Sequence, residues 1–265
     1  MDTHKIIKNV KDSGYFKIEN FLNEKEVEQI RKMAKNVHKG DAYKQYIPHT
    51  YPMLLKKIIK FDFNKLKQGF ILKDIIKKRP ELKSICNGVF EEKNDLKFID
   101  TYTLKDSQKV NWHTDHMLDK KIQHKIIFFV YLNSVSKNNG SMGYIKNSHK
   151  IIYFLKKGLI ENKIKLKELN NQNPTPLEGG DFSLEFFLDF IKESYNYLVD
   201  CLKSKKTIDS FVSNINSIIN ENETDKFYDV MKPGDAVIFN QSGIHGGTQA
   251  SKNERAILRL HWWTD

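Results

Sequence analysis

The strand signal of this chain is strongest in one stretch, which reads Lys97-Phe-Ile-Asp-Thr-Tyr-Thr-Leu104, then Trp112-His-Thr-Asp115, then His124-Lys-Ile-Ile-Phe-Phe-Val-Tyr-Leu132. β-Branched and aromatic residues dominate the first and third runs, which is typical of strands. Strand patterns return at residues 236–240, after a Pro-Gly turn, and at residues 255–263. The chain is therefore predicted to be mainly β, with helices flanking the sheets.

Two of the nine histidines lie in a context that suits a metal. His113 and Asp115 are two residues apart, and such residues project to the same side of an extended chain. His245 has glycines close on both sides, which allows a ligand to approach closely. Two imidazoles and one carboxylate are the protein ligands that hold non-haem Fe(II) on one face and leave the other face open. We therefore predict that His113, Asp115 and His245 ligate one metal, with a neighbouring strand bringing His245 alongside.

Arginine is rare in a chain with 44 lysines and arginines, and occurs only at positions 31, 79, 255 and 259. Two of the four lie in the last predicted strand. A guanidinium binds a carboxylate through two parallel hydrogen bonds, which lysine does less well. Arg255 is therefore predicted to hold a carboxylate, whereas Arg259 is interpreted as structural.

Each of these signals has a plainer interpretation when taken alone. A His-x-Asp tripeptide at a strand end is more often a hydrogen-bonded pair than a ligand pair. The two arginines of the last strand could form surface ion pairs on a sheet edge. The prediction depends on the ordered combination.

Four segments in sequence order carry a family resemblance. They read Gly14-Tyr-Phe-Lys-Ile-Glu-Asn-Phe-Leu-Asn-Glu-Lys-Glu-Val27, Trp112-His-Thr-Asp115, Asn139-Gly-Ser-Met-Gly-Tyr-Ile-Lys-Asn-Ser-His-Lys150, and Lys-Pro-Gly-Asp235 through His245-Gly to Arg255. Together they cover both ends and the middle of the chain. In this order they resemble the phytanoyl-CoA dioxygenase-like family of iron(II)/2-oxoglutarate-dependent oxygenases.

The resemblance implies a fold, a chemistry and a cofactor set. The fold would be a double-stranded β-helix (a jelly roll, cupin-like) with a helical insertion. The activity would be that of a dioxygenase that uses Fe(II), 2-oxoglutarate and O2, hydroxylates a small-molecule metabolite, and releases succinate and CO2. Arg255 would bind the far carboxylate of 2-oxoglutarate. Because Asp115 is retained, the chain resembles the hydroxylating or desaturating members rather than those that transfer halide.

Three positions depart from the family pattern. Asn147 stands where glycine is common before Ser-His, and asparagine tolerates the left-handed backbone of such a turn. Thr114 replaces a frequent glutamine between the first two ligands, which could change a co-substrate contact. Gly247 stands where a hydroxyl is common, so we expect another residue, Thr101 on the preceding strand, to assist Arg255. The competing interpretation of Thr101 is an ordinary strand threonine.

The net charge of +11 does not indicate nucleic-acid binding. The lysines are spread along the chain and are not interleaved with aromatics at one patch, and arginine is scarce. The charge could instead attract an anionic small-molecule substrate.

The two cysteines, Cys86 and Cys201, match no metal or redox spacing and are interpreted as thiols in a reducing compartment. The chain shows no N-terminal signal peptide and no apolar run of the roughly 20 residues that a membrane span needs. We therefore expect a cytoplasmic protein without a membrane span.

The length of 265 residues suits one domain over residues 1–265. A helix is expected from the capping motif Asn23-Glu-Lys-Glu26 to about Asn36, and lysine-rich helices over residues 64–92 are expected to pack outside a sheet. Residues 40–60 are interpreted as an aromatic loop. Apolar residues at helical spacing predict a helical insertion at about residues 151–226, the expected location of substrate selectivity.

Three rival functions remain open from the sequence. The first is a metal-binding, cupin-like barrel without oxygenase activity, against which the carboxylate clamp Arg255 argues. The second is a nucleic-acid demethylase of the same superfamily, whose second arginine would lie further along than Arg259. The third is an interaction protein with a degenerate site, which the presence of all three ligands disfavours.

Overall fold

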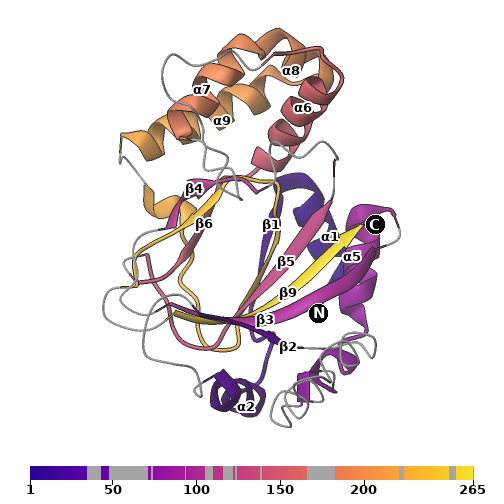
Figure 1. The fold of residues 1–265 in the computed structure, drawn as a ribbon, viewed down its shortest axis with the longest axis vertical. Helices are drawn as coiled ribbons and strands as arrows, with labels where there is room; N and C mark the ends of the chain where they lie inside the picture. Colours follow the sequence, from indigo (N-terminus) through magenta and orange to yellow (C-terminus); the bar gives the residue numbers. More distant parts are fainter. Residues whose placement is uncertain are drawn as a thin grey trace, which may run out of the picture.

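The fold is given by a computed structural model, which describes residues 1–34, 43–47, 71–92 except 73, 94–104, 110–115, 122, 124–165 except 138, 183–220, 224–250 and 255–264. These residues form two antiparallel sheets with helices on one side and at one end (Figure 1). The order of strands along the chain and their pairing into two facing sheets confirm the predicted jelly roll with flanking helices.

The larger sheet has six strands in the order β1-β7-β5-β9-β3-β2. Their bounds are β1 Tyr15–Ile18, β7 Ala236–Asn240, β5 Lys125–Tyr131, β9 Arg255–Thr264, β3 Asn94–Leu104 and β2 Tyr43–Ile47. The segment interpreted as a loop contains the strand β2, because residues 43–47 pair with β3 over five positions. The rest of that segment lies outside the described residues.

The smaller sheet has three strands in the order β4-β8-β6, with bounds β4 Val110–His113, β8 His245–Gly247 and β6 Met142–Tyr144. It faces the larger sheet across a shared core. Met142 and Tyr144 of the smaller sheet pack there with Ile127, Val237 and Phe239 of the larger one.

The two faces of the larger sheet have different neighbours. Successive side chains of a strand point to opposite faces. On β5, Ile126, Phe128 and Val130 belong to the cluster on the helix-covered outer face, whereas Ile127 and Tyr131 belong to the cluster between the sheets. The outer face therefore forms the main apolar core, and the inner face looks towards the smaller sheet.

Helices α1 (Thr3–Ser13), α2 (Glu24–Ala34) and α5 (Glu81–Phe90) supply the other half of the outer core. The predicted capping motif is present at the start of α2. The Asn23 side chain accepts from the Glu26 N–H and the Glu26 carboxylate accepts from the Asn23 N–H, both at 3.0 Å. Leu72 and Ile75, from the predicted lysine-rich helical region, also pack on this face.

The helices α6 (Ser148–Ile160), α7 (Leu184–Glu193), α8 (Tyr195–Leu202) and α9 (Lys205–Ile219) gather at one end of the sheets, followed by the short 3-10 helix η2 (Thr224–Phe227) (Figure 1). They share a core of their own. Asn147 starts α6 with a φ of +68°, which confirms the predicted left-handed turn. No helix among the described residues is long and apolar enough to cross a membrane.

Candidate metal centre

The two predicted histidine ligands are partners across a pair of strands. His113 ends β4 and lies opposite His245, which begins β8, and their ring centroids are 4.3 Å apart. The two residues are separated by 132 positions in the sequence, so strand pairing alone brings them together. One end of this strand pair thus presents two imidazoles side by side.

Main-chain carbonyls fix the orientation of both rings. Nδ1 of His113 lies 2.8 Å from the carbonyl of Asn111, and Nδ1 of His245 lies 2.9 Å from the carbonyl of Gly243. A carbonyl can only accept, so Nδ1 is the donor in each contact, and in the neutral ring Nε2 then carries the lone pair. Both lone pairs are therefore available to the same ion.

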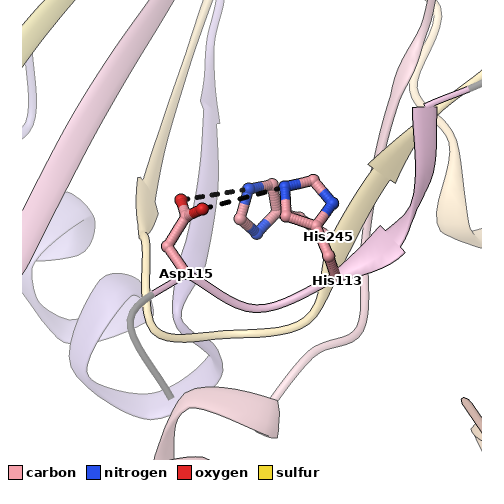
Figure 2. Close-up of side chains that lie close together, drawn as sticks. All are labelled: His113, Asp115 and His245. Atoms are coloured by element: carbon pink, nitrogen blue, oxygen red, sulfur yellow. Dashed lines mark ion pairs between the residues drawn. The ribbon is translucent and has the colours of Figure 1, made fainter. Parts of the chain in front are cut away.

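Asp115 completes the group from the turn that follows β4. Its Oδ1 lies 3.9 Å from Nε2 of His113 and its Oδ2 lies 3.7 Å from Nε2 of His245 (Figure 2). One donor atom from each of the three residues lies within 4.8 Å of the others. His113 ends the strand, so the pair is not held by one extended strand as the sequence suggested, yet the turn still directs both side chains to one point.

Two side chains hold Asp115 and its turn, and the sequence singles out only one of them, Thr114. The Gln241 amide donates a hydrogen bond to Asp115 Oδ2. The Thr114 hydroxyl, which is fully buried, donates to the carbonyl of Ser242 at 2.6 Å. Thr114 therefore ties the two ligand-bearing turns together. Neither residue type is distinctive enough in sequence to have revealed these contacts.

The electrostatic environment keeps His245 neutral. Burial lowers the pKa of His245 to about 4; repulsion from His113 adds to the effect and Asp115 opposes it. At neutral pH the ring is therefore uncharged, which is the form that binds a metal.

Arg255 lies at the start of β9 and is 5% exposed. Its Nη1 donates to the carbonyl of Gly140 at 3.4 Å, and a Cβ added at Gly140 would lie 3.0 Å from the Arg255 Cβ. Burial raises the pKa of Tyr131 to about 12, and the positive charge of the nearby Arg255 opposes that shift. A buried guanidinium thus lies on the inner face of the larger sheet, with a glycine and a neutral phenol beside it.

Thr101 does not share that face. It pairs with Leu258, which packs in the outer core, whereas Ile257, two positions after Arg255, packs between the sheets. Because directly paired residues point to the same face, Thr101 points away from the inner face that carries Arg255. The structure therefore does not support the expected contact of Thr101 with a carboxylate held by Arg255.

Two further histidines lie close to the ligands or to the Ser-His motif in sequence. Nε2 of His149, near the start of α6, lies 3.2 Å from the carbonyl of Lys11 near the end of α1, so this contact joins the two helices. His116 lies outside the described residues.

The model of the phytanoyl-CoA dioxygenase (PhyH) family matches residues 10–257 of the chain. A search of curated proteins found no match to the sequence. Among solved structures, HygX from Streptomyces hygroscopicus, solved with nickel and 2-oxoglutarate, is 12% identical with a TM-score of 0.55, over 97% of this chain and 85% of HygX.

Two further solved structures are similar to this chain over nearly its whole length. EvdO2 from Micromonospora carbonacea var. aurantiaca is 11% identical with a TM-score of 0.54, over 98% of this chain and 90% of EvdO2. SnoN, a non-heme alpha-ketoglutarate-dependent epimerase from nogalamycin biosynthesis, is 9% identical with a TM-score of 0.51, over 98% of this chain and 82% of SnoN. At such identities the likeness establishes the fold.

Proposed function

Because the chain belongs to the phytanoyl-CoA dioxygenase family, a family of oxidoreductases, we propose that it is an Fe(II)- and 2-oxoglutarate-dependent dioxygenase that hydroxylates a small-molecule metabolite. The observation that carries this proposal is the convergence of His113, Asp115 and His245 from separate segments. In the proposed reaction, one oxygen atom of O2 enters succinate and the other converts a substrate C–H into C–OH, with release of CO2.

The donor set fits a ferrous ion. Two neutral imidazoles and one carboxylate are the protein ligands of such non-haem iron sites. Each of the three side chains is also held in place by a hydrogen bond to another residue. His113, Asp115 and His245 would hold the metal. The chemistry that iron supplies when bound is activation of O2, coupled to oxidative decarboxylation of 2-oxoglutarate.

Arg255 would bind the distal carboxylate of 2-oxoglutarate. Its guanidinium is buried at 5% exposure, and an ion pair with a carboxylate is stronger where water is excluded. The chain's own residues thus have three tasks: they hold the metal, orient the co-substrate and keep water out.

We further propose one catalytic domain over residues 1–265, with the insertion at about 151–226 contributing to substrate selection. The expected partner is a small molecule and not a nucleic acid. Cys86 and Cys201 are free thiols, which suits the reducing environment of the cytoplasm.

The test of this proposal replaces His245 by alanine, with His4→Ala as the matched control because His4 is exposed on α1. We expect the wild type to bind one Fe(II) per chain anaerobically, as measured by calorimetry. His245→Ala should weaken this binding by more than about 100-fold, because loss of a residue that only hydrogen-bonds to a metal ligand already costs about 10–100-fold. Iron affinity that is the same in both variants would rule out the assigned ligand set.

The oxygenase activity is tested by succinate formation. Wild-type protein with Fe(II), 2-oxoglutarate and O2 should release succinate, and a panel of metabolites should reveal substrates that stimulate the release. A protein that binds iron normally but forms no succinate under any of these conditions is a metal-binding barrel and not an oxygenase. Binding to DNA or RNA at moderate salt would favour the demethylase alternative.

A further inference from the structure

A cavity of about 200 Å³ opens beside the metal centre. Its walls come from four places: the turn after β4, the residues before and at the start of β5, the end of β7 with the turn that follows, and one side of α6. Asp115 and Gln241, which form a hydrogen bond with each other, lie in its lining. The cavity therefore reaches the carboxylate of the proposed metal centre.

Basic side chains line this cavity. Lys125, Lys150 and Lys156 are all part of the wall, and Lys125 and Lys156 are only 9% and 8% exposed. Lysines are seldom buried to this extent. Asp115 is the one acidic residue among the described residues of the lining, which also holds three lysines.

Aromatic and aliphatic groups complete the wall. The ring of His124 stacks on Tyr153, with centroids 5.9 Å apart and an angle of 23° between the planes. The ammonium of the wall residue Lys125 lies 5.3 Å from the centre of the ring of Trp263, which is not itself part of the wall. On α6, His149, Ile152, Tyr153 and Lys156 are spaced as one helix face, which explains how a single helix forms one side of the cavity.

We propose that this cavity, which we call the lysine cavity, binds an anionic group of the primary substrate and so sets which bond faces the metal. The proposal builds on the proposed function, since the metal must lie at Asp115. Phosphate and carboxylate share the required chemistry, namely oxygens with full negative charge that accept from ammonium groups. The apolar groups of the wall would contact the part of the substrate next to that anionic group.

The lysine cavity differs from the Arg255 site in the kind of recognition it offers. A guanidinium recognises a planar carboxylate through a fixed fork, whereas several ammonium groups act as movable point charges and suit a tetrahedral phosphate as well. Arg255 begins β9 and is not part of the cavity wall, whereas the wall residue Lys125 pairs with Trp263 near the other end of that strand. The co-substrate and the substrate anion would therefore bind at separate positions.

The test measures binding of two inorganic or simple probes, pyrophosphate and malonate, to the full chain by calorimetry. Lys156→Met and Lys150→Met remove charge from the wall while keeping an apolar stem, and Lys150 is exposed enough for its variant to fold even if Lys156→Met does not. Lys157→Met is the matched control, because Lys157 follows Lys156 on the same helix, lies outside the wall and forms a surface ion pair with Glu161 at 3.8 Å.

We expect at least one probe to bind the wild type, and each wall variant to weaken that binding by about tenfold, the usual effect of losing one contact between charged groups. Lys157→Met should change it less than twofold. A preference for pyrophosphate assigns the group to a phosphate ester, and a preference for malonate assigns it to a carboxylate. The proposal is overturned if neither probe binds the wild type, or if the wall variants bind as tightly as Lys157→Met.

Fe(II) binding separates this inference from the proposed function. Lys156→Met and Lys150→Met should bind Fe(II) like the wild type, and His245→Ala should still bind the probe. Normal iron binding with no anion binding refutes the lysine cavity alone. Anion binding that depends on the wall lysines, in a protein that takes up no iron, refutes the oxygenase assignment instead.

Discussion

The two faces of the larger sheet have different roles: the outer face forms the main apolar core, and the inner face carries Arg255 of the proposed site. On β9, Ala256, Leu258, Leu260 and Trp262 join the outer core under the helices, whereas Arg255 and Ile257 face the smaller sheet. The same strand therefore contributes to the apolar core and to the proposed site with alternate residues. A difference of one position decides which role a side chain takes.

The outer face should show the largest effect on folding. Leu258→Ala removes a side chain that is 1% exposed and leaves a cavity in the main core. We expect the free energy of unfolding to fall by about 3 kcal/mol, as measured by urea denaturation, with the affinity for 2-oxoglutarate unchanged in the folded protein. Weaker co-substrate binding at a temperature where the variant is fully folded would contradict the separation of the two faces.

The inner face should show a large effect on binding. Arg255→Met keeps the apolar stem but removes the guanidinium, and we expect the Kd of 2-oxoglutarate to rise by about 30-fold or more, since losing one partner of a buried charge pair costs about 2 kcal/mol or more. Calorimetry with a redox-inactive divalent metal measures this. Arg255→Lys should recover only part of the affinity, because lysine lacks the planar fork. Full recovery would indicate that charge alone suffices.

Gly140 tests how closely the inner face is packed around Arg255. This glycine has a φ of +74°, and an added Cβ would lie 3.0 Å from the Arg255 Cβ. Gly140→Ala should lower the free energy of unfolding by about 1 kcal/mol through backbone strain, and should weaken 2-oxoglutarate binding several-fold by displacing Arg255. Thermal unfolding and calorimetry give the two values. A variant that loses stability but binds normally would show that the Arg255 position tolerates the shift.

Thr101 should show the smallest effect. Its side chain shares the outer face with Leu258, so Thr101→Val, which has nearly the same shape, is expected to change the Kd of 2-oxoglutarate by less than about twofold, because the side chain points away from Arg255. The same calorimetric titration measures it alongside Arg255→Met. A tenfold loss would place Thr101 beside the co-substrate after all.

The features that depend on local sequence patterns could be predicted. Strand composition around residues 97–132 and 236–263 predicted the sheets, and Asn23 with Glu26 predicted the start of α2, which the observed hydrogen bonds confirm. The His-x-Asp spacing and the later histidine predicted three side chains that the fold does bring together. These features could be predicted because each depends on a few residues and on the repeat of the backbone.

Features that depend on strand register, or on contacts between distant segments, could not be predicted from the sequence. Thr101 lies on β3, next to β9, and the face to which it points follows from its pairing with Leu258, which no local pattern encodes. The hydrogen bond from Gln241 to Asp115 and the lysine cavity likewise require a turn and a helix from distant parts of the chain to meet. Composition and residue spacing do not specify, to within one residue, how distant strands pair with each other.

The main-chain anchoring of the two imidazoles has a consequence for divergence among related sequences. The acceptor beside His113 is the carbonyl of Asn111, so any amino acid at position 111 offers the same anchor, and the exposed asparagine side chain can drift without disturbing the ring. The acceptor beside His245 belongs to Gly243, where an added Cβ would overlap the Tyr144 hydroxyl. Two anchors of identical geometry should therefore evolve at very different rates, one tolerant of almost any replacement and the other restricted to glycine.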